Sequence, residues 1–386
     1  MPYSINPYRN KSITSFRQFF RPIDNAIMGM TPMPAKGNRP LQMTFEDQLK
    51  ALVFFHLEEH TSAQHLLQVL EDDDFARNVI APEGGIKKSS FAEAINTRGL
   101  EQLFSIYENL QDQAIAVLPK EHEDLGELIA IDGSLIDACL SMQWADYRKG
   151  SKKAKVHVGL DLNHSIPRKV FLTHGNGAER PFVSKILSPG KTGVLDRGYQ
   201  AHDLFDSWQQ ENKNFVCRIK ASTTKACIQS KPTNPQSPVF CDAIVLLGTP
   251  GVNQTKEPVR VVAYTVEGTN YWVATNRYDL SAEQIAFIYK LRWDVEKFFA
   301  WWKRHLKVYH LIARSEYGLM VQILGGLITY LLLAIYCREQ HNEKVNIKRV
   351  RQLRIEIQNE LRSAMGGTTV SPDFENQKVS TPYAST

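Results

Sequence analysis

Hydrophobic positions recur with a helical period over the first third of the chain. Over residues 1–126, apolar side chains return every three to four residues, the spacing that gathers them on one face of a helix. Two such runs are Leu49, Leu52, Phe55 and Leu66, Leu67, Leu70. The pattern predicts an all-α N-terminal domain over residues 1–126.

Polar residues at the starts of these runs predict where the helices begin. Three capping boxes fit the sequence: Thr44-x-x-Asp47, Thr61-x-x-Gln64 and Ser90-x-x-Glu93. The third would open a short helix over 90–96, followed by Arg98-Gly99 and a longer helix. That order fits a DNA-binding helix-turn-helix, and it fits an ordinary helical bundle equally well.

From residue 127 the hydrophobic period becomes that of β-strands. Three strands are predicted in succession, and helices then alternate with strands, which is the order of a ribonuclease-H-like mixed sheet. The expected elements are strands at 128–132, 156–162 and 170–173, a helix at 178–187, a strand at 193–196, a helix at 201–211 and a strand at 215–219. We expect residues 127–219 to form the first part of this α/β core.

Residues 220–280 predict a β-rich insertion, with strands at 243–247, 259–264 and 271–274. A helix capped by Ser281-x-x-Gln284 follows. One face of it is apolar and the other carries one acid among cations. The apolar face is Ile288, Leu291, Val295, Phe298 and Trp302, and the polar face is Tyr289, Arg292, Glu296, Lys303 and Lys307. Residues 281–340 would hold this helix and a core helix, and residues 341–386 a C-terminal helix and a disordered tail.

The stretch from Tyr317 to Cys337 carries no charge and is long enough to span a bilayer. A helix buried at the centre of a large core has the same composition. Gln322, Thr329 and the pair Gly325-Gly326 dilute the apolar character. We expect the core helix, and we expect no membrane partner.

Composition sets the class of protein. The chain has 386 residues, 43% hydrophobic and 23% charged, with a net charge of +5, which excludes collagen-like and wholly disordered chains. A polyanionic partner would therefore have to be bound by local clusters of cations. The five cysteines form no C-x-x-C pair, so neither a zinc site nor a disulfide framework is indicated. A reducing, cytoplasmic compartment fits best.

Three acids are candidates for a shared site. Asp132 closes a predicted strand before Gly133, Asp196 closes another, and Glu296 lies on the amphipathic helix. Converging carboxylates suit Mg²⁺ or Mn²⁺, and two such ions can serve phosphodiester cleavage. Each acid alone also has an ordinary structural explanation, because Asp-Gly often forms turns and a helical Glu among cations is often a solvated ion pair.

Basic and aromatic residues surround these acids in the sequence. A cationic run lies between the first two predicted strands, where a loop would suit a phosphate backbone. It contains Arg148, Lys149, Lys152, Lys153 and Lys155. Arg292, Lys303 and Lys307 would extend it along the helix. Trp272 and Trp293 are candidates for stacking on a flipped base.

Together these residues resemble a known family. Tyr289-x2-Arg292-x3-Glu296-x6-Lys303 has the spacing of the Y-R-E-K signature of DDE transposases of the insertion sequence 4 family. Asp132-Gly133 and Asp196-Arg197-Gly198-Tyr199 resemble the first two catalytic blocks of that family. The resemblance covers roughly residues 127–337, and residues 44–118 look more loosely like the helical N-terminal region of the family.

The resemblance implies a function and a role for each matching residue. Asp132, Asp196 and Glu296 would bind two Mg²⁺ or Mn²⁺ ions and catalyse cleavage. Tyr289, Arg292 and Lys303 would hold DNA phosphates, with Arg197 beside them, while Trp272 and Trp293 would steady a flipped base. Such enzymes cleave the terminal inverted repeats of their element through a DNA hairpin and join the 3′-OH ends to target DNA.

The same resemblance implies partners and a location. The partner would be double-stranded DNA, the synaptic complex would be a homodimer, and the location would be the bacterial nucleoid. The alternative function is a transposase-derived protein that binds DNA without cleaving it.

Overall fold

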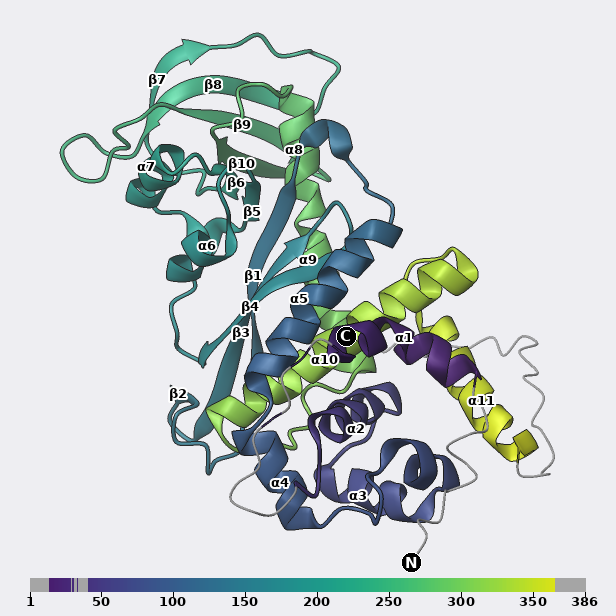
Figure 1. The fold of residues 1–386 in the computed structure, drawn as a ribbon. Helices are drawn as coiled ribbons and strands as arrows, with labels where there is room; N and C mark the ends of the chain where they lie inside the picture. The colour runs from purple at the N-terminus through teal and green to yellow at the C-terminus, as the bar shows by residue number, and fades with distance from the viewer. Residues whose placement is uncertain (1–13, 29, 31–32, 34–40, 365–386) are drawn as a thin grey trace, which may run out of the picture.

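The computed structural model describes residues 14–28, 30, 33 and 41–364. The N-terminal helices and the strand-rich part form one continuous molecule (Figure 1). The tail expected to be disordered lies outside the described residues from 365 onward, as do residues 1–13 of the expected helical domain.

The N-terminal part is helical, as predicted. Its elements are α1 (Thr14–Met28), α2 (Phe45–Leu57), α3 (Ala63–Asp72), the π-helical turn η2 (Ala76–Ile80), α4 (Lys88–Thr97), α5 (Leu100–Val117) and the 3-10 turn η3 (Glu123–Leu125). The hydroxyl of Tyr107 on α5 donates to the Pro167 carbonyl 2.9 Å away, and α5 also packs on α10 (Glu316–His341). The α4–α5 pair therefore packs into the core, as helices of an ordinary bundle do.

One of the three predicted N-terminal capping boxes exists. Thr44 caps α2 and forms the full reciprocal box with Asp47. The box at Thr61 is wrong, because Ser62 is the residue that caps α3, through the N–H of His65. The box at Ser90 is also wrong. There α4 starts at Lys88 and has no side-chain cap.

A single mixed sheet of ten strands forms the centre of the molecule. The strands are β1 (Leu128–Asp137), β2 (Asp146–Arg148), β3 (Ser151–Asp161), β4 (Ile166–His174), β5 (Thr192–Leu195), β6 (Asn214–Arg218), β7 (Lys225–Ser230), β8 (Val239–Leu247), β9 (Val259–Val266) and β10 (Thr269–Thr275). β1 is antiparallel to β3 and parallel to β5, and β5 is parallel to β6. This is the predicted ribonuclease-H-like α/β arrangement.

The strands of residues 220–280 extend the same sheet. β10 pairs antiparallel with β6, and β9, β8 and β7 follow outward in that order. Figure 1 shows them at the end of the sheet farthest from α2, α3 and α4. The β-rich region therefore enlarges the platform on which the core is built.

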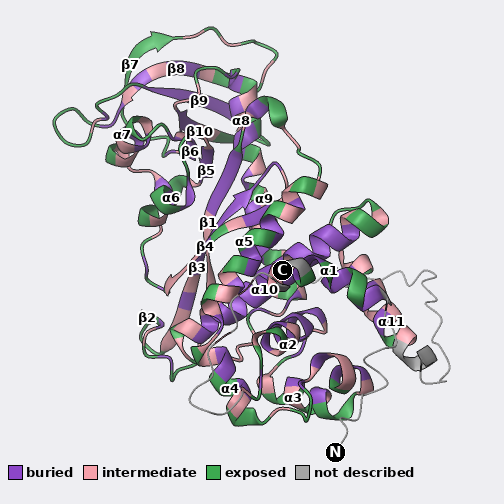
Figure 2. Cartoon of the chain, viewed as in Figure 1, coloured by how far each residue is buried: buried purple, intermediate pink, exposed green. Residues whose placement is uncertain are grey.

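Helices cover both faces of the sheet, and the alternation along β1 shows how the two cores arise. Leu128 and Ala130 face the core that contains α8 (Ala282–Leu291), α9 (Trp293–His305) and α10, whereas Ile129 and Ile131 face α6 (Arg180–Ile186) and α7 (His202–Gln210). Successive strand residues point to opposite faces, so β1 is buried on both sides. Figure 2 shows this strand buried along much of its length.

The amphipathic helix is broken at Arg292 into α8 (Ala282–Leu291) and α9 (Trp293–His305). Its predicted apolar face is buried except for Leu291, which is half-buried, and its predicted start is confirmed by a capping box between Ser281 and Gln284. The predicted polar face extends too far. Lys307 lies beyond the end of α9 with a backbone φ of 50°.

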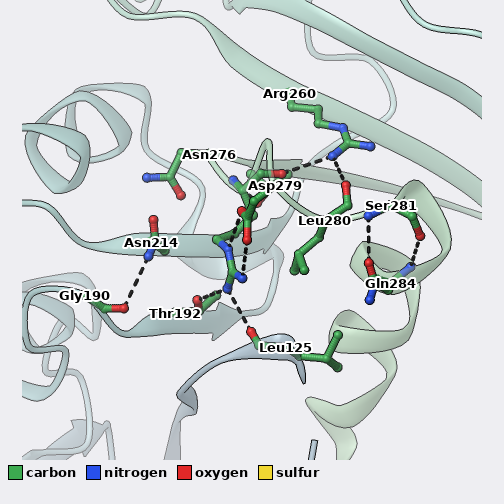
Figure 3. A network of polar contacts seen from close by, with 12 residues as sticks. Leu125, Gly190, Thr192, Asn214, Arg260, Asn276, Asp279, Leu280, Ser281 and Gln284 are labelled. Atoms are coloured by element: carbon green, nitrogen blue, oxygen red, sulfur yellow. Dashed lines mark hydrogen bonds and ion pairs between the residues drawn. The ribbon is translucent and has the colours of Figure 1, made fainter. Parts of the chain in front are cut away.

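Hydrogen bonds anchor the start of α8 to the sheet (Figure 3). Arg260 forms a buried, two-point ion pair with Asp242 and donates to the Leu280 carbonyl 2.6 Å away. Arg277 donates to the Leu125 carbonyl and to the Thr192 hydroxyl, at 3.0 and 2.7 Å. The segment leading into α8 is thereby tied to the starts of β1 and β5.

The uncharged segment forms most of α10 (Glu316–His341). By length and composition α10 could cross a membrane, but 89% of its most apolar 18-residue window is buried inside the protein. It packs against α2, α4, α5 and β4. These contacts are those of a core helix. α11 (Ile347–Ala364) follows and packs on α1.

Candidate active site

Asp132 lies on β1, and Asp196 directly follows β5, the parallel strand beside it. In the register of β1 and β5, Leu128 is opposite Thr192 and Ala130 is opposite Val194. Continuing that register by two residues brings Asp132 level with Asp196, on the face of the sheet that α9 covers. Parallel strands lie about 4.8 Å apart, and the charge of Asp196 raises the pKa of Asp132, so the two carboxylates are near enough to interact.

The strand does not end at Asp132 as predicted. β1 continues to Asp137, because residues 133–137 keep pairing with β3 as far as Asp137 opposite Lys153. Asp196 does follow its strand, and its side chain caps the 3-10 turn η4 (Arg197–Tyr199) by accepting the Gly198 N–H at 2.7 Å.

The environment of Asp132 makes its carboxyl harder to ionise. Burial raises its pKa, the Gly133 N–H and Arg292 lower it, and the negative charges of Asp196 and Glu179 raise it, which together give a pKa of about 6. Oxygen Oδ1 accepts the Gly133 N–H at 2.8 Å. A carboxyl held in this way ionises more readily when a cation is bound beside it.

Glu179 is a third acid near this pair, and it was not predicted from the sequence. Its Oε1 lies 2.9 Å from Nζ of Lys155, and its charge reaches both Asp132 and the buried Tyr199. A Cβ on residue 133 would lie 3.1 Å from the same Oε1, so Gly133 leaves room for this approach. The sequence carries no signal for it, because Glu179 precedes α6 as an ordinary polar residue.

Glu296, the third predicted acid, is held by an ion pair. Its Oε1 lies 2.8 Å from Nη1 of Arg292, which is 7% exposed and whose Nε has no hydrogen-bond partner in the described structure. Tyr289 is buried against Arg292, whose guanidinium carbon lies 5.6 Å from the tyrosine ring centroid. Within the described ranges, no three His, Cys, Asp or Glu side chains are grouped closely enough to hold a metal ion.

Lys303 reaches the same part of β1. Its Nζ donates to Oγ of Ser134 at 2.9 Å, two residues beyond Asp132 on the same face of the strand. Burial lowers the pKa of Lys303, and the charge of Asp137 opposes that shift. Arg292, Lys303 and the two aspartates therefore occupy one region, where α9 crosses β1.

The basic run forms a β-hairpin, not the predicted loop. Arg148 and Lys149 are exposed at its tip, where Arg148 lies over the ring of Tyr147. The remaining lysines pair with acids: Lys152 with Asp146, Lys153 with Asp137 and Lys155 with Glu179. The free positive charge of this hairpin is therefore concentrated at its tip.

The remaining candidates lie apart from one another. Trp293 is 49% exposed beside the Arg292 guanidinium, and Trp272 on β10 lies beneath Nζ of Lys225, 4.4 Å from its ring centroid. Arg197 is exposed next to Asp196. Lys307 points toward α2, with Nζ 3.5 Å from Oε2 of Glu59, so it does not extend the cationic track along α9.

Comparison with known proteins agrees with this architecture. Residues 123–332 match the family described as Transposase DDE domain, and the chain belongs to that family. It is 29% identical over 208 residues to a probable transposase for insertion sequence element IS5377 of Geobacillus stearothermophilus, covering 53% of this chain and 55% of that protein. It is 26% identical over 220 residues to a putative transposase for insertion sequence element IS4SA of Synechocystis, covering 54% and 60%.

A third relative is the putative transposase y4zB of Sinorhizobium fredii, 26% identical over 201 residues, covering 50% of this chain and 56% of that protein. The chain thus spans somewhat more than half the length of the curated relatives it matches. The region shared with the family contains Asp132, Asp196 and Glu296, which supports the resemblance found in the sequence.

Proposed function

We propose that the chain is a DNA transposase. It binds the terminal inverted repeats of its insertion sequence, cleaves the ends by metal-dependent phosphodiester hydrolysis through a hairpin intermediate, and joins the 3′-OH ends to target DNA. The observation that supports this most is the position of Asp132 on β1 beside Asp196 at the end of the parallel β5, with Lys303 and the Arg292–Glu296 pair packed over β1. It acts on double-stranded DNA in the bacterial cytoplasm, as a homodimer and without a membrane partner.

The acids present fit divalent metal ions. Asp132 and Asp196 are hard oxygen donors whose mutual repulsion a cation would relieve. These two would hold Mg²⁺ or Mn²⁺, and Glu296 would join them after leaving Arg292. Two such ions would neutralise the charge that develops on the attacking and leaving oxygens.

The side chains around the acids are suited to holding the DNA. The buried Nε of Arg292, which has no partner among the described atoms, gains one when a phosphate oxygen arrives, and a phosphate competes with Glu296 for the guanidinium. Lys303 would bind a neighbouring phosphate from its place on Ser134. Trp293 would offer an exposed ring to a flipped base.

One observation favours a second function. Glu296 is paired with Arg292, and the described residues hold no cluster of three metal-binding acids. A DNA-binding protein derived from a transposase and unable to cleave would be compatible with that arrangement. A nicking assay on the ends of the element that encodes this chain distinguishes the two functions.

Substitution of the strand acids tests the proposal. We expect Asp132→Asn and Asp196→Asn to reduce Mg²⁺-dependent cleavage of the element's ends to background, because an amide is a poor ligand for the ion. End binding, measured by gel shift, should persist. Asp137→Asn is the matched control, since that exposed acid lies in the same strand and pairs with Lys153. Cleavage that survives either catalytic substitution would remove that residue from the site.

A further inference from the structure

A polar groove lies beside Asp196 on the α7 side of the sheet. It has a volume of about 760 Å³ and is lined by the start of α7, the turn after β6 and the loop between β8 and β9. Arg197, the residue after Asp196, belongs to its lining, and so does Arg180 at the start of α6. We call this surface the α7 groove.

Positive charge dominates the α7 groove. Its four cations, Arg180, Arg197, Lys220 and Lys256, are all exposed, and none of them forms an ion pair with a residue that the structure describes. Of its two acids, Asp203 is exposed, whereas Asp206 is buried and accepts the backbone N–H groups of Lys256 and Glu257. Four unpaired cations facing one free carboxylate make a site for a polyanion.

Hydrogen bonds fix the walls of the groove. Arg180 donates from Nε to the Gly198 carbonyl at 3.0 Å, which ties it to the turn that follows Asp196. Gln200 accepts the Lys220 N–H at 2.9 Å and joins the turn after β6 to the same region. On the opposite wall, Nδ1 of His202 lies 2.6 Å from the Asn253 carbonyl. The cations therefore sit on a preformed surface.

The lining suits a sugar-phosphate backbone. Apolar side chains are few, since Ala201 and Val252 are the apolar members larger than glycine, so the groove provides no pocket for a base. Hydroxyl groups of Ser222, Thr223 and Thr224 stand among the cations. Cations interspersed with hydroxyl donors are the usual contacts of DNA phosphates.

We propose that the α7 groove binds the backbone of duplex DNA that flanks the scissile phosphate, on the host side of the element's end. This rests on the proposed function. We propose that the N-terminal helices α2 and α3 contact the element's end, and these helices lie at the opposite end of the molecule from α7, with β1 between them (Figure 1). DNA that passes Asp132 and Asp196 and continues toward α7 is therefore DNA beyond the cleavage point.

The test measures DNA affinity of the full chain against salt concentration. The double variant Lys220→Ala/Lys256→Ala removes two exposed groove cations, and Lys120→Ala/Lys169→Ala is the matched control away from the groove. Three probes are used: the element's terminal repeat with flanking host DNA, the same repeat trimmed at the cleavage point, and a random duplex. Log affinity falls as log salt rises, and each lost phosphate contact makes that negative slope shallower by about 0.9.

On the flanked probe, we expect the groove variant to make the negative slope shallower by about 1.8. On the trimmed probe the slope should stay unchanged, and the control variant should change the slope on neither probe. An unchanged slope on the flanked probe overturns the groove as a DNA contact. An equal fall on all three probes overturns its assignment to the flank. The groove variant keeps both aspartates. If the slopes rule out DNA binding in the α7 groove, cleavage at low salt that still depends on Asp132 would continue to support the proposed transposase function.

Discussion

Arg292 links the acid of its own helix to the acids of the sheet. Its side chain pairs with Glu296, and its charge also lowers the pKa of Asp132. Removing one partner of a buried charge is costly, because the other charge stays desolvated. Glu296→Gln would therefore disturb Arg292 as well as any metal ion. For this reason the two aspartates provide the cleaner test of catalysis.

Lys303 permits a sharper test at the same scale. If it holds a DNA phosphate, Lys303→Ala should weaken DNA binding and reduce the salt slope by about 0.9. Its hydrogen bond to Ser134 offers the control, because Ser134→Ala removes the local contact and keeps the charge. Equilibrium binding at several salt concentrations measures both variants. Equal slopes in wild type and Lys303→Ala would leave Lys303 with a structural role alone.

At the scale of elements, the anchored start of α8 positions the residues of α9, because α9 follows α8 directly after Arg292. Ser281 and Gln284 form a full capping box there, next to the Arg260 and Arg277 anchors. A capping hydroxyl satisfies an N–H group that has no partner inside the helix. Ser281 therefore contributes to the stability of this junction beside the two arginine anchors.

Loss of that cap should be measurable. We expect Ser281→Ala to lower the free energy of unfolding, measured by urea denaturation, by about 1 kcal/mol. Thr61→Ala is the control, because Thr61 has the same sequence pattern but Ser62 caps α3. The control should change stability by less than about 0.5 kcal/mol. Similar losses in both variants would show that the cap at Ser281 contributes nothing particular.

These caps illustrate how far the sequence predicts the structure. Short β-rich runs between turn residues predicted the strands of the meander, β5, β6 and the strands β8 to β10, because burial on defined faces imposes that pattern, whereas the short β2 and the exposed β7 were not predicted. The break at Arg292 was missed, since the apolar spacing from Ile288 to Val295 continues across it. The end of β1 was misplaced, because Asp-Gly usually turns, whereas here Gly133 pairs with His157 on β3.

The candidate site was also predictable only in part, because a sequence pattern shows neighbours along one segment and not contacts between distant segments. Fixed spacing along one helix identified Tyr289, Arg292, Glu296 and Lys303, because those positions share one segment. Glu179 and the α7 groove could not be found, since they depend on contacts between segments far apart in the sequence. The pairing of Lys152, Lys153 and Lys155 with acids likewise follows from strand packing.

At the scale of the whole molecule, α10 and α2 join the helical and strand-rich parts. His56 on α2 is fully buried between them, with Nδ1 2.6 Å from the Leu306 carbonyl and Nε2 3.1 Å from the Gln322 carbonyl. Residue 306 follows α9, and Gln322 lies on α10. A single imidazole therefore connects the N-terminal helices to the end of the helix that carries Glu296.

This junction should make the protein sensitive to acid. Burial lowers the pKa of His56 from 6.5 to about 4, so the unfolded chain binds this proton more readily than the folded one. The stabilisation is present above pH 6.5 and is lost as the pH falls toward 4. Between pH 7 and pH 5 the loss from this residue is about 2 kcal/mol. His60 and His157 have pKa values lowered in the same direction and add to the effect.

The contribution of His56 can be isolated with His56→Gln, whose amide can still donate to one of the two carbonyls but does not titrate. Urea denaturation at pH 7 and pH 5 should show a smaller pH dependence of unfolding free energy in this variant than in wild type, by about 2 kcal/mol. His174→Gln, at an exposed histidine, should keep the wild-type difference. If His56→Gln also keeps it, the acid sensitivity does not come from His56.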